Sequence, residues 1–239
     1  MSTVPERNVE ARHLVWSLYR DSADEDYLIA RRSAQSKLSR PFYWNALQAL
    51  EKYLKCILLL NDRSIDSYSH DLVKPWLVVK EVCGRLLPDL ICPPHYVNTR
   101  RTGISIPFEL TEQFLKRYEY LGHPNNRYRY YSTSHGDYDL HKFDEVCFRL
   151  RRVCFPLDMI PGSETRSFRE ILSIDDSIQI HHQFSFLPTT LKGAERRRRI
   201  QALSWMNFSY CEDLALKRGK VLAGGRAENS SLWLLANTI

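Results

Sequence analysis

Apolar residues recur every three or four positions along most of residues 1–160, which is the period of an amphipathic helix. The strongest repeat lies within residues 41–60, where gaps of four, three, four and three separate Tyr43, Leu47, Leu50, Leu54 and Ile57. Neighbouring apolar side chains widen this stripe over much of the helix circumference. Such a helix has to be covered on several sides, so we expect it to be the central member of a helical bundle.

Weaker repeats of the same kind predict the helices around it. We expect a leading helix at residues 9–19, a second helix capped by Ser22, a third beginning near Ser69 and His70, a fourth capped by Thr111, and a last core helix at residues 140–154. We expect residues 88–108 to form an irregular segment that connects the third helix to the fourth. The fold class is therefore all-α. We expect an antiparallel bundle over residues 1–160 and a mostly helical C-terminal extension over residues 161–239, which either stands apart or belongs to the same core.

A family resemblance rests on two short pieces of the sequence. The first is Trp44, Ala46, Gln48, Ala49 and the run Glu51-Lys52-Tyr53-Leu54-Lys55; the second, one loop later, is His70-Asp71-Leu72. Together they resemble the HEPN family of small helical domains, with a looser echo at Asn125 to Tyr128. The resemblance implies an HEPN-like helical bundle.

Catalytic members of that family are metal-independent ribonucleases that carry an Arg followed, after four to six residues, by a His. In such a site the His takes a proton from a ribose hydroxyl and the Arg stabilises the charge on phosphate. The resemblance also implies that two chains meet at the site as a homodimer. Four Arg–His pairs in this sequence have that spacing, which is close to the number expected by chance. Their positions in the chain favour two of these pairs, Arg129 with His135 and Arg63 with His70.

Each candidate has a structural alternative. His70 either acts as a base or only packs beside the start of a helix. The segment from residue 123 to 139 interleaves tyrosine with arginine, which suits base stacking and phosphate contact, or else seals the end of the bundle. Our candidates for nucleic-acid binding there are Asn126, Arg127, Tyr128 and Tyr130. In the extension, Arg196 and Arg197 either face an acidic ligand or are solvated.

Composition limits the remaining possibilities. The formal charge is +6, from 34 basic against 28 acidic residues, which permits a polyanionic partner without requiring one. The six cysteines form no C-x-x-C pair, so we expect reduced, buried thiols. We expect neither a metal site nor a cofactor, no membrane span and a cytoplasmic location.

The sequence therefore supports two hypotheses. The first is an RNA-directed HEPN protein that acts as a dimer, as an endoribonuclease of a toxin–antitoxin or antiviral defence system. The alternative is a catalytically inactive HEPN module that binds a nucleotide or a protein partner.

Overall fold

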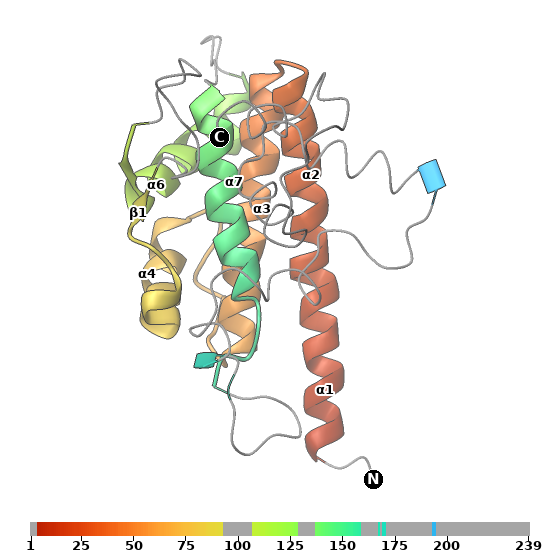
Figure 1. Cartoon of the computed structure of the whole chain (residues 1–239). Helices are drawn as coiled ribbons and strands as arrows, with labels where there is room; N and C mark the ends of the chain where they lie inside the picture. Colours follow the sequence, from red (N-terminus) through yellow and green to blue (C-terminus); the bar gives the residue numbers. More distant parts are fainter. Residues whose placement is uncertain are drawn as a thin grey trace, which may run out of the picture.

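A computed structural model describes residues 4–92, 107–128 and 137–158, together with residues 167, 169–170 and 193–194. For residues 4–8, 127–128 and 137–138 it describes the backbone alone. The described elements are helices apart from one pair of very short strands, so the all-α prediction is confirmed (Figure 1). Most of the predicted extension lies outside these residues.

The chain opens with a continuous helical column. Helix α1 (Val4–Val15) runs through a π-helical segment, η1 (Trp16–Asp21), directly into α2 (Ser22–Gln35). Our prediction that Ser22 caps a separate helix is therefore wrong: its backbone is helical, and its hydroxyl instead accepts a hydrogen bond from Lys52 Nζ at 2.7 Å. Asp24 and Asp26, which follow Ser22 and resemble the acidic first turn of a helix, instead bind Arg151 and Lys52 of other helices.

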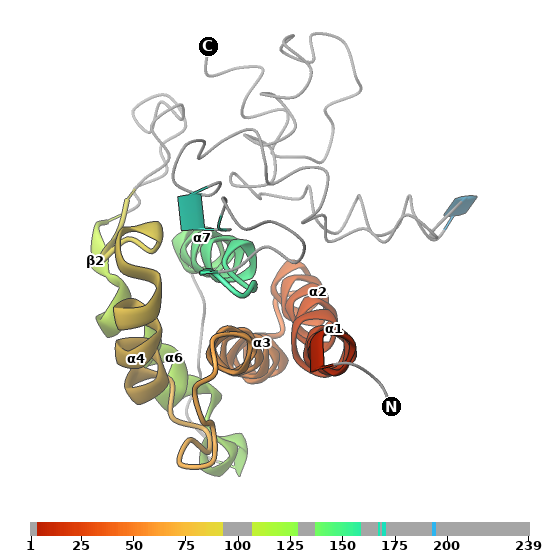
Figure 2. The ribbon, with the colours of Figure 1, turned by 90° about the horizontal axis from the view of Figure 1, so that it is seen from below.

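Helix α3 (Ser39–Leu60) is the central element, as its apolar repeat predicted. It contacts α2, α4, α6 and α7, and a view along the bundle places it between α2 on one side and α4 and α6 on the other (Figure 2). Pro41 lies in its first turn, where no backbone donor is required. The five residues of the predicted stripe are at most 2% exposed.

Asn61 ends α3 and joins it to the end of α7. Its side-chain amide donates to the carbonyls of Ile57 at 2.8 Å and Phe155 at 2.9 Å, and its side-chain oxygen accepts from the Leu157 amide at 2.9 Å. Asp62 follows with a positive φ of 56°, which turns the chain out of the helix. The predicted exit at Asn61 and Asp62 is confirmed.

The second half of the bundle contains α4 (Val73–Cys83), the short helix η2 (Gly84–Leu86), α6 (Thr111–Gly122), η3 (Pro124–Tyr128) and α7 (Asp137–Arg152). Strands β1 (Leu90–Ile91) and β2 (Glu109–Leu110) pair antiparallel; β1 lies within residues 88–108, the segment predicted to be irregular, and β2 directly follows that segment. Among the helices described, none is both long and apolar enough to cross a bilayer.

Two predicted helix caps are wrong. The amide of Lys74, in the first turn of α4, donates to Asp71 Oδ1 at 3.0 Å, so Asp71 rather than Ser69 caps this helix. Thr111 is already the first residue of α6, and its hydroxyl donates to the Pro88 carbonyl at 3.0 Å. At α4 the capping side chain is two residues after the predicted one, and at α6 the N-cap residue Leu110 makes no side-chain cap hydrogen bond.

Candidate functional site

His70 lies beside the middle of α3 rather than inside α4. The loop from residue 61 to 72 leaves the end of α3 and returns along its side, so that His70 Nδ1 lies 3.0 Å from Glu51 Oε2. The other carboxylate oxygen of Glu51 accepts from Lys55 Nζ at 2.6 Å. Glu51 is 8% exposed, whereas the His70 side chain is 41% exposed. A buried carboxylate thus holds one nitrogen of an imidazole that is itself partly exposed.

Two carboxylates, Glu119 on α6 and Asp71 in the loop itself, fix the loop that carries His70. Glu119 of α6 accepts from the Leu72 amide at 2.9 Å, and Asp71 caps α4 while forming an ion pair with Lys74 at 2.8 Å. Burial alone would raise the pKa of Asp71, but the hydrogen bonds from Lys74 outweigh it and lower the pKa. Asp71 is therefore held in its charged form, in which it caps best.

Gly122 brings a second histidine to the same place. A Cβ on Gly122 would lie 2.6 Å from both the Tyr43 carbonyl and Leu47 Cβ, so only glycine lets the end of α6 approach α3 this closely. The next residue is His123, whose ring centre lies 6.5 Å from that of His70 with the rings at 85°. Trp44 of α3 completes the aromatic group, 6.3 Å from His70.

The backbone after α6 holds the ring of His123. The Asn125 amide donates to His123 Nδ1 at 3.2 Å, and the Asn126 amide donates to the His123 carbonyl at 2.9 Å. The Asn126 side chain also bonds to the carbonyl of Tyr120. The segment predicted to bind nucleic acid therefore begins directly beside His70, although the side chains of Arg127 and Tyr128 lie outside what the structure describes.

The structure does not bring Arg63 to His70. The Arg63 amide bonds to the carbonyl of Leu58, which is seven residues beyond Glu51. At the helical rise this is about 10 Å along α3 from the carboxylate that holds His70. Arg63 is exposed, and its side chain makes no hydrogen bond or ion pair with any described residue. The predicted Arg63–His70 pair is not assembled in this chain.

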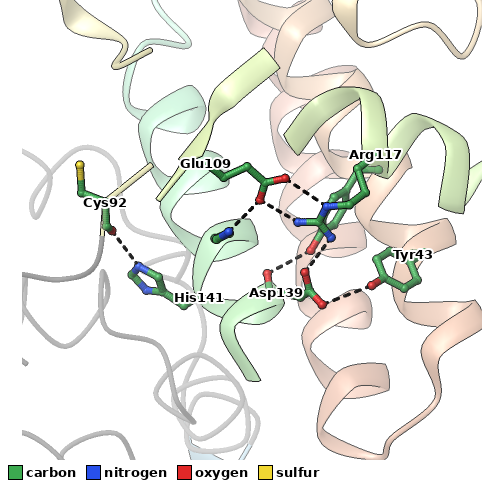
Figure 3. Close-up of polar contacts among 8 residues, drawn as sticks. Tyr43, Cys92, Glu109, Arg117, Asp139 and His141 are labelled. Carbon is green, nitrogen blue, oxygen red and sulfur yellow. Dashed lines mark hydrogen bonds and ion pairs between the residues drawn. The ribbon is translucent and has the colours of Figure 1, made fainter. Parts of the chain in front are cut away.

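Arg117, which precedes His123 at the family spacing, belongs to a different cluster (Figure 3). It donates to both oxygens of Glu109, at 3.1 and 2.9 Å, and to Asp139 Oδ1 at 2.7 Å. Lys142 also bonds to Glu109 at 2.9 Å, and the Tyr118 hydroxyl donates to the carbonyl of Asp139 at 3.0 Å. We name Glu109, Arg117, Asp139 and Lys142 the α6–α7 charge cluster. Two carboxylates and two cations balance there.

Burial and charge pairing set the pKa values in this cluster. Burial alone would raise the pKa of Glu109, but hydrogen bonds from Arg117 and Lys142 lower it. Asp139 is 4% exposed and lies in α7, so the prediction that residues 123–139 form a loop outside the core is wrong at its C-terminal end. These side chains join β2 and α6 to the first turn of α7.

Helices α2 and α7 share a second set of buried charges. Arg31 forms an ion pair with Asp144, and both side chains are at most 1% exposed. The Tyr27 hydroxyl donates to Asp144 Oδ1 at 2.8 Å. Further along, Arg151 Nε donates to Asp24 Oδ1 at 2.8 Å, and the Tyr53 hydroxyl donates to the same oxygen at 2.6 Å. Burial raises the pKa of Tyr27 and of Tyr53 well above the usual value.

The other predicted site residues lie outside the described part of the chain. This holds for Arg129, Tyr130, His135, Arg196 and Arg197. Among the residues that are described, no three His, Cys, Asp or Glu side chains converge as ligands of a metal ion would. Of the five cysteines described, all have free thiols, and Cys56, Cys83, Cys147 and Cys154 are buried as expected.

Sequence reasoning missed two members of the site. The spacing of Glu51 and Lys55 indicates an i,i+4 pair, and the structure contains that pair. The bond from Glu51 to His70 joins residues 19 positions apart, which no local pattern indicates. His123 follows Arg117 at the family spacing, but this spacing does not locate it in the site. The glycine before it, Gly122, does. A glycine at the end of an amphipathic helix that packs on α3 marks a close approach, and the residue after it is carried to the interface.

The sequence matches no protein-family model, and searches of curated proteins and of solved structures find no similar entry. The geometry of the site therefore carries the functional argument by itself.

Proposed function

We propose that this chain is an RNA-directed protein of the HEPN type and that it cleaves RNA with His70 as the general base. The observation that supports this most directly is the contact between His70 Nδ1 and Glu51. A carboxylate accepts hydrogen bonds only, so the nitrogen facing it carries the proton and Nε2 keeps its lone pair. The His70 side chain is 41% exposed, so the ring is partly open to a substrate.

The reaction would be an internal transesterification. Nε2 of His70 takes the proton of a ribose 2′-hydroxyl, whose electron pair forms the new bond to phosphorus as the bond to the 5′-oxygen breaks. Water protonates the leaving 5′-oxygen, and the hydroxide that remains takes the proton from His70. The products are a 2′,3′-cyclic phosphate and a 5′-hydroxyl, and Glu51 stabilises the charged ring between the two proton transfers.

Two features favour RNA over other substrates. The formal charge of +6 suits a polyanion, and the segment with Asn126, Arg127 and Tyr128 starts at the His123 ring beside His70. Trp44 next to His70 places an aromatic group where an unpaired base can stack. Single-stranded RNA supplies the splayed bases and the 2′-hydroxyl that this arrangement requires.

The test is cleavage of single-stranded RNA in EDTA. We expect the wild-type protein to produce 2′,3′-cyclic phosphate ends and His70→Ala to lower the rate by about a hundredfold to ten-thousandfold, the range for a lost general base. His13→Ala is the matched control, because His13 is exposed on α1 and lies outside the site. His135→Ala in the same series tests the Arg129–His135 pair. Equal rates for wild type and His70→Ala would overturn the assignment of the base.

A second candidate function is a catalytically inactive HEPN module that binds a nucleotide or a protein partner. It is favoured by the charge cluster that binds Arg117 and by the distance of Arg63 from His70, since neither arginine is placed to stabilise a phosphate there. If the wild-type protein binds RNA and leaves it intact, this second function replaces the first. We propose a homodimer in either case, and sedimentation measurements test it.

A further inference from the structure

We propose that His70 and His123 of one chain form a ribonucleotide subsite that reads the 2′-hydroxyl and the adjacent 3′-phosphate together. The inference rests on the RNA-directed function proposed above and names the chemical unit that this site recognises. It starts from the hydrogen bonds that the two rings make with the protein. These bonds leave each ring with one nitrogen for a ligand. One of these two nitrogens is a hydrogen-bond acceptor and the other is a donor.

The protein imposes opposite tautomers on the two histidines. Glu51 accepts at His70 Nδ1, so this nitrogen is protonated and Nε2 is a hydrogen-bond acceptor. The Asn125 amide donates to His123 Nδ1, so that nitrogen holds a lone pair and the proton is on Nε2, which is a donor. The pair therefore has one acceptor and one donor nitrogen left, on rings whose centres lie 6.5 Å apart.

A 3′-ribonucleotide presents the complementary groups on neighbouring atoms. Its 2′-hydroxyl donates a hydrogen bond and its 3′-phosphate accepts one, whereas DNA lacks the hydroxyl. The ring centres are 6.5 Å apart with the rings at 85°, which is close enough for neighbouring groups of one 3′-ribonucleotide to reach both rings. His70 would thus select the sugar and His123 would hold the phosphate.

The rings are held by two helices of the fold, α3 and α6. Glu51 lies on α3, Glu119 of α6 fixes the loop behind His70, and Gly122 allows the end of α6 to contact α3. Each ring is therefore in place before a ligand arrives. Both histidines belong to the same chain, in contrast to the two-chain site that the family resemblance implies.

Nucleotide binding tests the subsite without any need for cleavage. We would titrate the full chain with adenosine 3′-monophosphate, its 2′-deoxy analogue and adenosine 5′-monophosphate by calorimetry. We expect the 3′-ribonucleotide to bind about tenfold more tightly than the other two, the effect of one hydrogen bond. Equal affinity for the 3′-ribonucleotide and its 2′-deoxy analogue would overturn the proposal.

Variants separate the two roles. His70→Ala should remove the preference for ribose and leave residual affinity for both 3′-nucleotides. His123→Ala should weaken both by about tenfold, whereas His123→Gln, whose amide keeps a donor, should restore most of the affinity. If His123→Gln binds no better than His123→Ala, His123 is not a donor to phosphate. His13→Ala is again the control.

Nuclear magnetic resonance reads the tautomers directly. In long-range proton–nitrogen spectra of protein with ¹⁵N-labelled histidine, we expect a protonated Nδ1 on His70 and a protonated Nε2 on His123, with His70→Ala and His123→Ala supplying the assignments. The same tautomer on both rings would overturn the proposal even if RNA is cleaved. Complementary tautomers and ribonucleotide preference without RNA cleavage would leave the subsite standing and refute the nuclease, so the two failures are distinguishable.

A mixing experiment tests whether His70 and His123 of the same chain form the subsite. If cleavage occurs, mixing His70→Ala with His123→Ala should give no recovery, because neither chain then has a complete pair. A site shared across a two-fold dimer would restore about a quarter of the wild-type rate, since half of the dimers would be mixed and each would have one intact site of two. Such recovery would contradict the single-chain subsite and keep His70 as the base.

Discussion

The α6–α7 charge cluster and the histidine site use similar side chains in opposite ways. In the cluster, Glu109 and Asp139 are both occupied by cations from neighbouring elements, and each charge is balanced (Figure 3). At the site, Glu51 is sequestered like Glu109, yet the ring that it binds keeps one nitrogen and 41% of its side-chain surface open. What distinguishes His70 is that a buried carboxylate holds one of its nitrogens while the side chain is partly exposed, whereas atoms without a hydrogen-bond partner among the described residues also occur in the buried core, as at Asp144 Oδ2.

The buried charges between α2 and α7 support the same distinction. Burial raises the pKa of Tyr27, Tyr53 and Cys147 well above their usual values. Perturbed pKa values often mark active sites, but structural ion-pair networks perturb them too. In these helices the perturbed groups face one another across the core, where they specify how α2 packs on α7.

The largest expected effect comes from breaking the closed network at Asp144. Asp144→Ala leaves the Arg31 guanidinium buried without its counter-charge and removes the acceptor of the Tyr27 hydroxyl. We expect a loss of about 3–5 kcal/mol in the free energy of unfolding, measured with urea. The double variant Arg31→Met with Asp144→Leu should recover most of this. A single variant that costs less than about 1 kcal/mol would show that the pair is not sealed from water.

Removing Arg117 should have a smaller and pH-dependent effect. Arg117→Met deletes the hydrogen bonds to Glu109 and Asp139 and should cost about 2 kcal/mol at pH 7. The pKa of Glu109 is lower in the folded protein, so its contribution is present above the unfolded value of about 4.3 and is lost as pH falls through the lowered value.

The difference in stability between wild type and Arg117→Met should therefore shrink between pH 7 and pH 3. Lys116→Met is the control, because Lys116 is exposed on the same helix and its side chain has no hydrogen bond or ion pair with any described residue. A deficit that stays constant over this pH range would mean that Arg117 stabilises the fold by packing on Tyr118, where its guanidinium lies 5.3 Å from the ring centre, and not through charge.

Gly122→Ala should change both the stability of the fold and the position of His123 in the site. The added Cβ would lie 2.6 Å from the Tyr43 carbonyl, a backbone atom that cannot move aside without shifting α3. We expect a loss of about 1–3 kcal/mol, together with a change in the His123 ring signals as the end of α6 moves away. Gly84→Ala is a useful contrast: it meets no atom within 4 Å but has a φ of +58°, so its cost should come without any change at His123.

The smallest effect should follow removal of the helix cap beside His70. Asp71→Ala deletes the acceptor for the Lys74 amide and should cost about 1 kcal/mol in urea unfolding, whereas Asp71→Asn should keep most of the stability. Because the pKa of Asp71 is lowered in the folded protein, the difference between wild type and Asp71→Ala should diminish on acidification. An unchanged stability in Asp71→Ala would show that solvent replaces the cap.

The sequence predicted the parts of the fold that depend on local periodicity. The stripe of α3 and its exit at Asn61 follow from spacing alone, and α7 was placed within three residues of its observed bounds. The join between α1 and α2 was missed because Asp24 and Asp26 resemble a helix start. In the structure they bind Arg151 and Lys52 from other helices, which no local pattern reveals.

The candidate site was only half predictable for the same reason. His70 was identified, but its partners Glu51 and His123 lie 19 residues before and 53 residues after it along the chain. The family spacing pointed to Arg63 and Arg117 instead. Whether an arginine at that spacing reaches a histidine depends on how the loops return along α3, and Arg117 has stronger partners in Glu109 and Asp139.

The joint at Asn61 has a mechanical consequence. Two hydrogen bonds of the Asn61 side chain fasten the end of α3 to the segment after α7, ten residues beyond Glu51 and so about 15 Å along the helix. The described chain after α7 is thus anchored at the end of α3 through Phe155 and Leu157. Force applied to the chain beyond it would be absorbed at the base of the bundle before it could displace the two imidazoles.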